Sequence, residues 1–182
     1  MNATIRFGVL SSFESRATLT KASENIYGQA MLPLFDLGGA DVVFSFGANF
    51  LETWLSPVAY TRGFAGMRKA SHTKHRGYFV QFEPRMSQTA ARADEWIPVK
   101  PGTEGLVALA IGKLAVEIRS IPMPRAFAGI DPADVAAKSE VKLETLERLA
   151  GMFAGSVQSL AIPGGAALGQ SNGLATAESV LA

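Results

Sequence analysis

The chain has 182 residues, of which 48% are hydrophobic and 18% charged, and these values are typical of one globular domain with a sizeable core. The formal net charge of +1 and the lack of a long basic tract give no electrostatic case for nucleic acid as a partner. The chain has no cysteine, which excludes disulfides, thiolate nucleophiles, cysteine-ligated zinc and any iron–sulfur cluster held by this chain alone.

No segment is predicted to cross a membrane. The longest apolar stretch, GLVALAIGKLAVEI (105–118), is interrupted by Lys113 and Glu117 and is too short to span a bilayer. The beginning of the chain, MNATIRFGVLSSFESR, lacks the basic start, long apolar run and cleavage site of a signal peptide. If the protein is exported, we expect its signal to lie elsewhere than on this chain.

The first half of the chain is predicted to alternate strands and helices. A short strand is expected at 5–10, and a helix at 12–28 because Ser12 is a plausible N-cap and Gly28 a plausible stop. The near-continuous apolar run VVFSFG (42–47) predicts a strand that is covered on both faces. The next expected elements are a helix at 57–69 opened by Pro57, a strand at 78–82, a short helical piece at 89–93 and a strand at 95–99.

The second half is predicted to be mainly helical. A strong helix is expected at 102–118, and the proline-rich segment RSIPMPRAFAGIDPAD is expected to be a loop, with a possible internal boundary at 119–132. The remaining expected elements are a helix after Asp131 with Pro132 at its first position, an amphipathic helix at 141–155, a strand at 159–165 and a last helix at 172–182.

This alternation predicts a three-layer α/β fold over 1–182, Rossmann-like, with a mainly parallel sheet and helices on both faces. In such sheets ligands bind beyond the carboxyl ends of the strands. Gly47, Glu83, the turn at 101–104 and the Gly164-Gly165 pair all follow predicted strands, and we expect them to lie along one edge of the sheet.

The first candidate site residues are Gly47, Asn49 and Thr53. A glycine at a strand end permits close approach of a ligand, and Asn49, Thr53 and the amides of a following helix can donate hydrogen bonds to phosphate oxygens. The alternative is a plain strand-to-helix turn, since the stretch FGANFLE is not the G-x-G-x-x-G fingerprint of dinucleotide binding.

Three further polar residues complete a possible purine-nucleotide pocket. Glu83 could accept from ribose hydroxyls, and Arg85 could meet a phosphate as a planar fork, the alternative being a surface Glu–Arg pair. Glu104, at a helix start, could accept from the N1 and N2 hydrogens of guanine, the alternative being a helix-capping acid.

Other polar and aromatic residues have simpler interpretations. The basic segment RKASHTKHR (68–76) is expected to be a solvated loop, because its histidines suit no defined metal site. Trp54 and Trp96 are expected in the core, and Asp94-Glu95 in a solvated turn. No Ser-His-Asp arrangement is evident.

The stretches ADVVFSFGANFLETWLSPV and FVQFEPRMSQTAARADEWIPVKPGTEGLVALAI resemble the molybdopterin oxidoreductase family of the dimethyl sulfoxide reductase type. The resemblance is greatest to large subunits of quinol-linked membrane complexes, such as those related to polysulfide reductase and alternative complex III. The tail LAIPGGAALGQSNGLATAESVLA is also similar, so the resemblance covers nearly the whole chain.

The resemblance implies a molybdopterin guanine dinucleotide cofactor, held in part by a domain of this kind. It implies that the Gly47–Asn49 turn meets the pyrophosphate, that Glu83 and Arg85 meet ribose or guanine, and that Gly102, Thr103 and Glu104 meet the guanine edge. Three positions depart from the family pattern: Glu83 and Glu104 stand where aspartate is usual, and Phe50 stands where proline is common.

The family's molybdenum ligand and iron–sulfur cysteines precede this segment, so the resemblance implies one domain of a larger subunit, or a split or truncated product, that is not catalytic alone. The implied partners are the remainder of the large subunit and the iron–sulfur and membrane subunits of a quinol-linked complex, at a periplasmic or membrane-associated location. The alternatives are a cofactor-free structural subunit of an electron-transfer complex and a stand-alone nucleotide-binding module.

Overall fold

The computed structural model describes residues 16–70 and 75–182. Its centre is a parallel sheet in which four strands lie in the order β3-β2-β1-β4. β1 lies between β2 and β4: its Val43 pairs with Phe79 on one side and with Leu160 on the other. The strands are β1 (Val42–Phe46), β2 (Tyr78–Phe82), β3 (Glu95–Ile97) and β4 (Ser159–Pro163).

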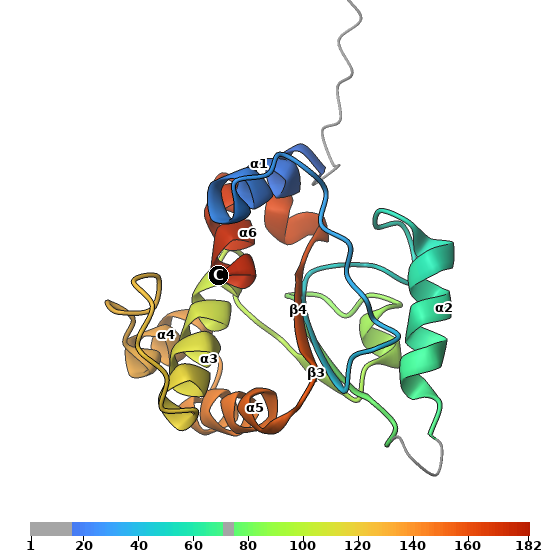
Figure 1. The fold of residues 1–182 in the computed structure, drawn as a ribbon. Helices are drawn as coiled ribbons and strands as arrows, with labels where there is room; N and C mark the ends of the chain where they lie inside the picture. Colours follow the sequence, from blue (N-terminus) through green and yellow to red (C-terminus); the bar gives the residue numbers. More distant parts are fainter. Residues whose placement is uncertain (1–15, 71–74) are drawn as a thin grey trace, which may run out of the picture.

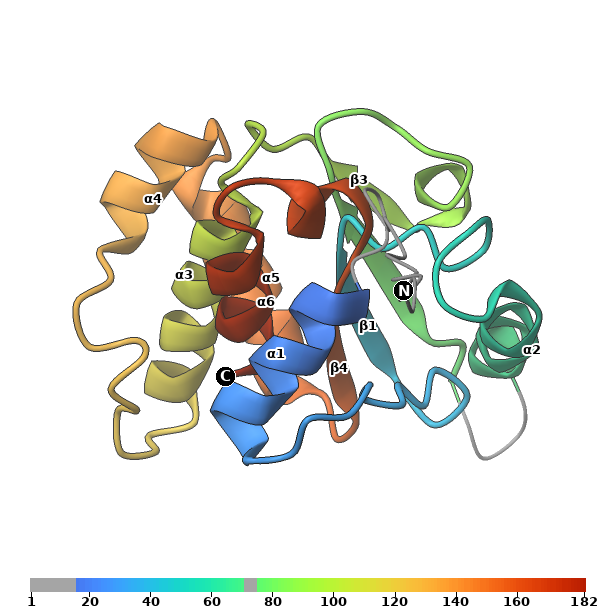
Figure 2. The same cartoon turned by 90° about the horizontal axis from the view of Figure 1, so that it is seen from above.

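Helices cover both faces of this sheet, which confirms the predicted three-layer α/β fold. Figure 1 shows α2 on one side of the sheet, and α3, α4, α5 and α6 on the other. Viewed from above in Figure 2, β4 lies at one margin of the sheet and β3 at the opposite margin, with α1 beside α6. The helices are α1 (Arg16–Tyr27), α2 (Pro57–Arg68), α3 (Glu104–Ile118), α4 (Pro132–Ser139), α5 (Leu143–Gly155) and α6 (Gly173–Leu181), with 3-10 turns η1 (Ala90–Arg92) and η2 (Gly165–Gly169).

The strands are apolar on both faces because both faces are covered. Phe44 and Phe46 of β1 and Phe82 of β2 belong to the core beneath α3 and α5, and the rings of Phe46 and Phe82 stack with centroids 4.6 Å apart. Val43 and Phe79, one position away, belong to the core beneath α2. Successive residues of a strand point to opposite faces, so a near-continuous apolar run is what this layered arrangement favours.

The local signals act as predicted at several helix ends. Pro57 occupies the first turn of α2, the carboxylate of Asp131 accepts a hydrogen bond from the amide of Ala133 at the start of α4, and Gly28 ends α1 with a φ of 71°. The predicted strand at 95–99 is shorter and ends at Ile97, before Pro98. The strand predicted at 5–10 and the Ser12 cap lie outside the described residues.

The proline-rich segment links α3 to α4 as a loop. Phe127 within it is buried against Gly112 of α3, and residues on both sides of the loop, such as Val107 and Leu146, pack in one core cluster. The boundary at 119–132 stays a prediction. Within 16–70 and 75–182, no helix combines the length and the apolar character that crossing a bilayer requires.

Candidate functional site at the carboxyl edge of the sheet

The residues that follow β1, β2 and β4 lie side by side at the carboxyl edge of the sheet, as predicted. In each case one backbone hydrogen bond extends the pairing of two neighbouring strands by one residue. The three positions therefore lie at the same height along the strands. These bonds run from the amide of Gly47 to the carbonyl of Phe82 (2.9 Å), from Gly164 to Phe46 (3.1 Å) and from Glu83 to Ile97 (3.3 Å).

The chain adds β2 and β3 on one side of β1 and β4 on the other, so the strand order reverses between β1 and β4. The segments that leave these two strands both contain glycine, and they meet at this point. Gly47 has a φ of 76°, and a Cβ atom there would lie 2.9 Å from the carbonyl oxygen of Gly164. A Cβ atom on Gly165 would overlap the carbonyl oxygen of Gly47. Glycine is therefore required where the two exits cross, and in open α/β sheets such a reversal is where ligands bind.

The segment after Gly47 differs from the expected strand-to-helix turn. α2 begins only at Pro57, and the amides of Glu52, Thr53 and Trp54 all donate to the carbonyl oxygen of Asn49, over 3.0, 3.1 and 3.2 Å. The amides of these three residues are therefore engaged within the turn, and phosphate binding by amides of the following helix stays a prediction. The amides at 48–50 donate to no acceptor within the described residues, and they are the donors that remain for an anion.

Glu83 is buried, and its carboxylate closes the turn that follows β2. Oε1 accepts from the amide of Ser87 over 2.6 Å, and Oε2 accepts from the side-chain amide of Gln81 over 3.0 Å. The alternative of a surface Glu–Arg pair is therefore wrong. Arg85 lies on the exposed turn that Glu83 holds, and it has no ion-pair partner in the described part of the chain.

Glu104 lies in the first turn of α3, where its side chain is 1% exposed. Its Oε2 atom has no hydrogen-bond partner within the described ranges. Burial raises the pKa of this carboxyl group, against the opposing effect of hydrogen bonds from backbone groups of Glu104 and Gly102. An unpaired buried acceptor is costly, so this oxygen is suited to a ligand that brings a donor.

The turn before α3 is fastened to the segment that precedes α6. The side-chain amide of Asn172 donates to the carbonyl oxygen of Gly102 over 2.8 Å, and a Cβ atom on Gly102, whose φ is 84°, would lie 2.9 Å from Oε1 of Gln170. The hydroxyl of Thr103 donates to the carbonyl oxygen of Lys100. Sequence reasoning missed Gln170 and Asn172, although a polar Q-S-N run directly before a helix was a usable signal.

The two glutamates lie on opposite faces of the sheet. The side chain of Glu83 meets Gln81, which is buried on the same side as Phe79 and α2, whereas Glu104 starts α3 on the other side. No described contact joins them, and the expected pocket with both glutamates in one crevice stays a prediction. A ligand that touches both residues has to cross the edge of the sheet.

Trp54 adds a polar atom at the strand reversal. Its ring is buried in the core beneath α2, as predicted, and its indole nitrogen lies beside Gly164 without a hydrogen-bond partner in the described residues. The sequence predicted the burial of Trp54 and gave no sign of this unpaired donor.

The prediction of a solvated turn at Asp94 is wrong. The carboxylate of Asp94 is 11% exposed, pairs with Arg68 and Arg76, and accepts from the amide of Phe79 over 2.8 Å. It therefore joins α2 to the start of β2. His72 and Lys74 of the basic segment lie outside the described residues, and among those that are described no cluster of three metal-ligating side chains occurs.

Two of the known proteins similar to this chain have molybdopterin in their names. The chain is 33% identical over 140 residues to the menaquinone reductase molybdopterin-binding-like subunit of Nitratidesulfovibrio vulgaris, a match that covers 71% of this chain and 20% of that protein. It is 40% identical over 70 residues to the arsenate respiratory reductase molybdopterin-containing subunit of Chrysiogenes arsenatis, covering 37% and 8%. It is 32% identical over 90 residues to a probable dimethyl sulfoxide reductase chain of Escherichia coli, covering 49% and 11%.

The fold has a similar solved structure, acetylene hydratase from Pelobacter acetylenicus. The TM-score is 0.63 at 16% identity, over 91% of this chain and 23% of that one. No protein-family model matches the sequence. The chain thus spans about a fifth of the length of the menaquinone reductase subunit and of acetylene hydratase.

Proposed function

Because this chain belongs to the molybdopterin oxidoreductase family, we propose that the carboxyl edge of its sheet holds the guanine dinucleotide part of a molybdopterin cofactor. The observation that carries this proposal is the unpaired, buried Oε2 atom of Glu104 beside the Gly102 turn. The guanine edge offers two parallel N–H donors, which match a carboxylate acceptor.

The remaining cofactor contacts are assigned to polar groups that have no hydrogen-bond or ion-pair partner in the described part of the chain. The amides at 48–50 and the side chain of Asn49 are the donors for the pyrophosphate, with the exposed Thr53 nearby. Arg85 is the cation for a phosphate or ribose group, and Glu83 supports it by holding its turn closed. Gly102 and Thr103 shape the approach to Glu104.

The cofactor, when bound, supplies oxygen-atom or electron transfer at molybdenum. In this proposal the residues of this chain bind and orient the nucleotide end of the cofactor. This division is consistent with the share of the relatives that the chain covers, about a fifth of the menaquinone reductase subunit.

The assembly that we propose is quinol-linked, with the remainder of a large subunit and iron–sulfur and membrane subunits as partners, at a periplasmic or membrane-associated location. The name of the menaquinone reductase relative supports this part. Fractionation of the host cells tests it: we expect the chain to co-purify with a membrane-bound complex that oxidises or reduces a quinone, and recovery as a free cytoplasmic protein would contradict it.

A cofactor-free structural subunit is the second candidate, and Glu83 favours it. Both carboxylate oxygens of Glu83 already accept hydrogen bonds from Gln81 and Ser87, so the acid expected at a ribose is engaged within the chain. In this candidate the domain keeps the fold and supports an electron-transfer complex without binding the nucleotide.

Elemental analysis and nucleotide release separate the candidates. The assembly purified through this chain is analysed for molybdenum and, after acid release, for guanine nucleotide by mass spectrometry. Both together support cofactor binding, nucleotide without molybdenum indicates a stand-alone nucleotide module, and neither indicates the structural subunit. Glu104→Gln is expected to lower the nucleotide content at least tenfold, and Glu117→Gln, on the same helix but about half exposed, is the matched control.

A further inference from the structure

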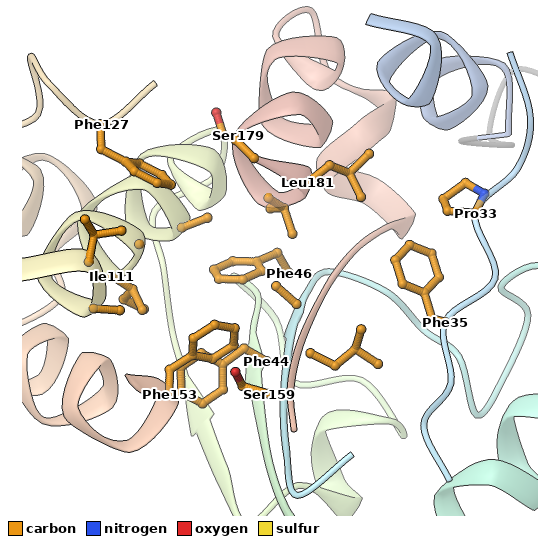
Figure 3. Close-up of a pocket in the computed structure, with 18 of the residues that line it drawn as sticks. Pro33, Phe35, Phe44, Phe46, Ile111, Phe127, Phe153, Ser159, Ser179 and Leu181 are labelled. Atoms are coloured by element: carbon orange, nitrogen blue, oxygen red, sulfur yellow. The ribbon is translucent and has the colours of Figure 1, made fainter. Parts of the chain in front are cut away.

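A long apolar groove follows the free side of β4. β4 is the last strand in the order, so one of its sides has no neighbouring strand in the part of the chain that the structure describes. A cavity of about 570 Å³ lies against this side. Figure 3 shows Phe44, Phe46 and Phe153 on one side of β4 and Phe35 on the other, so the groove surrounds the strand margin and touches both faces of the sheet.

The backbone of β4 offers hydrogen-bonding groups to this groove. The carbonyl of Gln158 accepts from Val42, and the amide of Gly164 donates to Phe46, which shows that even-numbered residues of this segment bond to β1. In a parallel ladder alternate residues face alternate sides, so Ser159 and Ala161 direct their amides and carbonyls to the open side. Pro163, which has no amide hydrogen, ends this outward row.

Large apolar side chains are exposed along the mouth of the groove. Leu34 is 89% exposed, Tyr27 54% and Ile121 51%, and all three line the cavity. A strand margin with free backbone groups between apolar walls is a template for strand addition, and proteins ordinarily cover it. The groove therefore fits an extended segment that is apolar on both faces, as buried parallel strands are.

We propose that this groove receives an apolar β-strand from the polypeptide that supplies the remainder of the subunit, paired with Ser159 and Ala161 as a fifth strand of the sheet. The length of the relatives supports this occupant, because this chain covers 20% of the menaquinone reductase subunit and 23% of acetylene hydratase. The geometry supports it as well, since a strand lies about 4.8 Å from its neighbour and backbone pairing gives affinity while the side-chain pockets give specificity.

The topology agrees with a parallel strand in this position. α6 follows β4 and lies on the opposite face of the sheet from α2, which leads from β1 to β2. A right-handed connection through a helix on that face leads away from β1, to the open side of β4. This inference rests on the proposed larger assembly, and it is independent of the cofactor.

Single introduced cysteines test the inference, because the chain has none of its own. Ala161→Cys lies in the groove, and Val58→Cys, on α2 at 77% exposure, is the control. Each variant is treated with N-ethylmaleimide as the isolated full chain and as the assembly purified from its host. We expect the labelling rate of Cys at 161 to fall at least tenfold in the assembly, and that at 58 to be unchanged.

A benzophenone maleimide attached at position 161 then identifies the occupant. A crosslink to an apolar segment of the companion polypeptide supports the proposal. An equal labelling rate in both samples, a crosslink to a second copy of the chain, or a crosslink to residues 1–15 of the same chain overturns it.

Introducing a charged side chain at the mouth of the groove tests the proposal independently, through recovery of the companion polypeptide with the purified chain. Leu34→Glu is expected to reduce recovery of the companion polypeptide at least fivefold, whereas Val58→Glu, at an exposed apolar position outside the groove, is expected to retain it. Equal recovery with both variants counts against the proposal. Molybdenum and nucleotide are measured on the same samples, so protection at position 161 without cofactor contradicts the proposed function alone.

Discussion

The side-chain amide of Asn172 donates to the carbonyl oxygen of Gly102, and this bond joins two segments that lie 70 residues apart in the sequence. It fixes the turn that presents Glu104 at the start of α3. A residue that contributes nothing to the core therefore controls the position of the strongest candidate for guanine recognition.

Asn172→Ala is expected to lower the affinity for guanine nucleotide about fivefold, since a neutral hydrogen bond contributes about 1 kcal/mol and its loss frees the Gly102 turn. The measurement is titration calorimetry of the purified assembly with the released nucleotide. Asn25→Ala, which removes an exposed side-chain bond to Glu178 at a distance from the turn, is the control. Equal affinities for both variants would show that the turn is held without Asn172.

The pH dependence of stability is expected to change with Glu104→Gln. Burial raises the pKa of Glu104 above its ordinary value of 4.5, so the folded chain binds more protons than the unfolded chain between that value and the raised one. The contribution of this group to stability is therefore present below pH 4.5 and is lost as the pH rises through the folded pKa. The glutamine variant cannot titrate and keeps its stability across this window.

Urea unfolding at several pH values measures this difference. At neutral pH we expect Glu104→Gln to be more stable than the parent chain while it binds guanine nucleotide less tightly. Stability of the parent that rises with pH relative to the glutamine variant would contradict the assigned direction.

Asp94→Ala is expected to destabilise the fold by about 2–4 kcal/mol, because it leaves two arginines and the amide of Phe79 without their shared acceptor in a half-buried network. Asp134→Ala removes an exposed pair with Lys138 and is expected to cost about 0.5 kcal/mol or less. The difference between the two unfolding free energies in urea is the test, and similar values would mean that the Asp94 network contributes little.

Gly47→Ala is expected to destabilise the chain by about 1–3 kcal/mol, because the backbone there has a φ of 76° and the added Cβ atom would press on Gly164 and Ala167. Gly151→Ala, inside α5 with no atom near the new Cβ, is expected to stabilise it by up to about 1 kcal/mol. The two melting temperatures should therefore move in opposite directions, and a shift of both in one direction would refute the close approach of β1 and β4.

The sequence was sufficient to predict the layered fold, because its strongest signals are local. The run VVFSF is apolar at four of its five buried positions, as two covered faces favour, and Pro57, Asp131 and Gly28 mark helix ends through their own backbone chemistry. The shared edge of Gly47, Glu83 and Gly164 followed from the same alternation of elements.

The errors arose where distant residues determine the outcome. Asp94 seemed solvated because its partners Arg68 and Arg76 lie on other segments. The turn after Gly47 moves the start of α2 to Pro57 and contains Leu55 at a φ of 45°. Leucine rarely adopts this conformation, so its sequence does not predict it. The faces on which Glu83 and Glu104 lie depend on which side successive residues of β2 point to and on how the chain passes from β3 to α3. No local sequence pattern predicts that passage.

α6 extends from the Gly102 turn to the groove at β4. It begins beside Asn172, which fastens the Gly102 turn, and nine residues later, about 14 Å along the axis, Val180 and Leu181 line the groove at β4. In the two proposals made above, the two ends of this short helix therefore contact different partners. The two partners should consequently bind cooperatively, since whichever binds first orders this helix and lowers the entropic cost for the second.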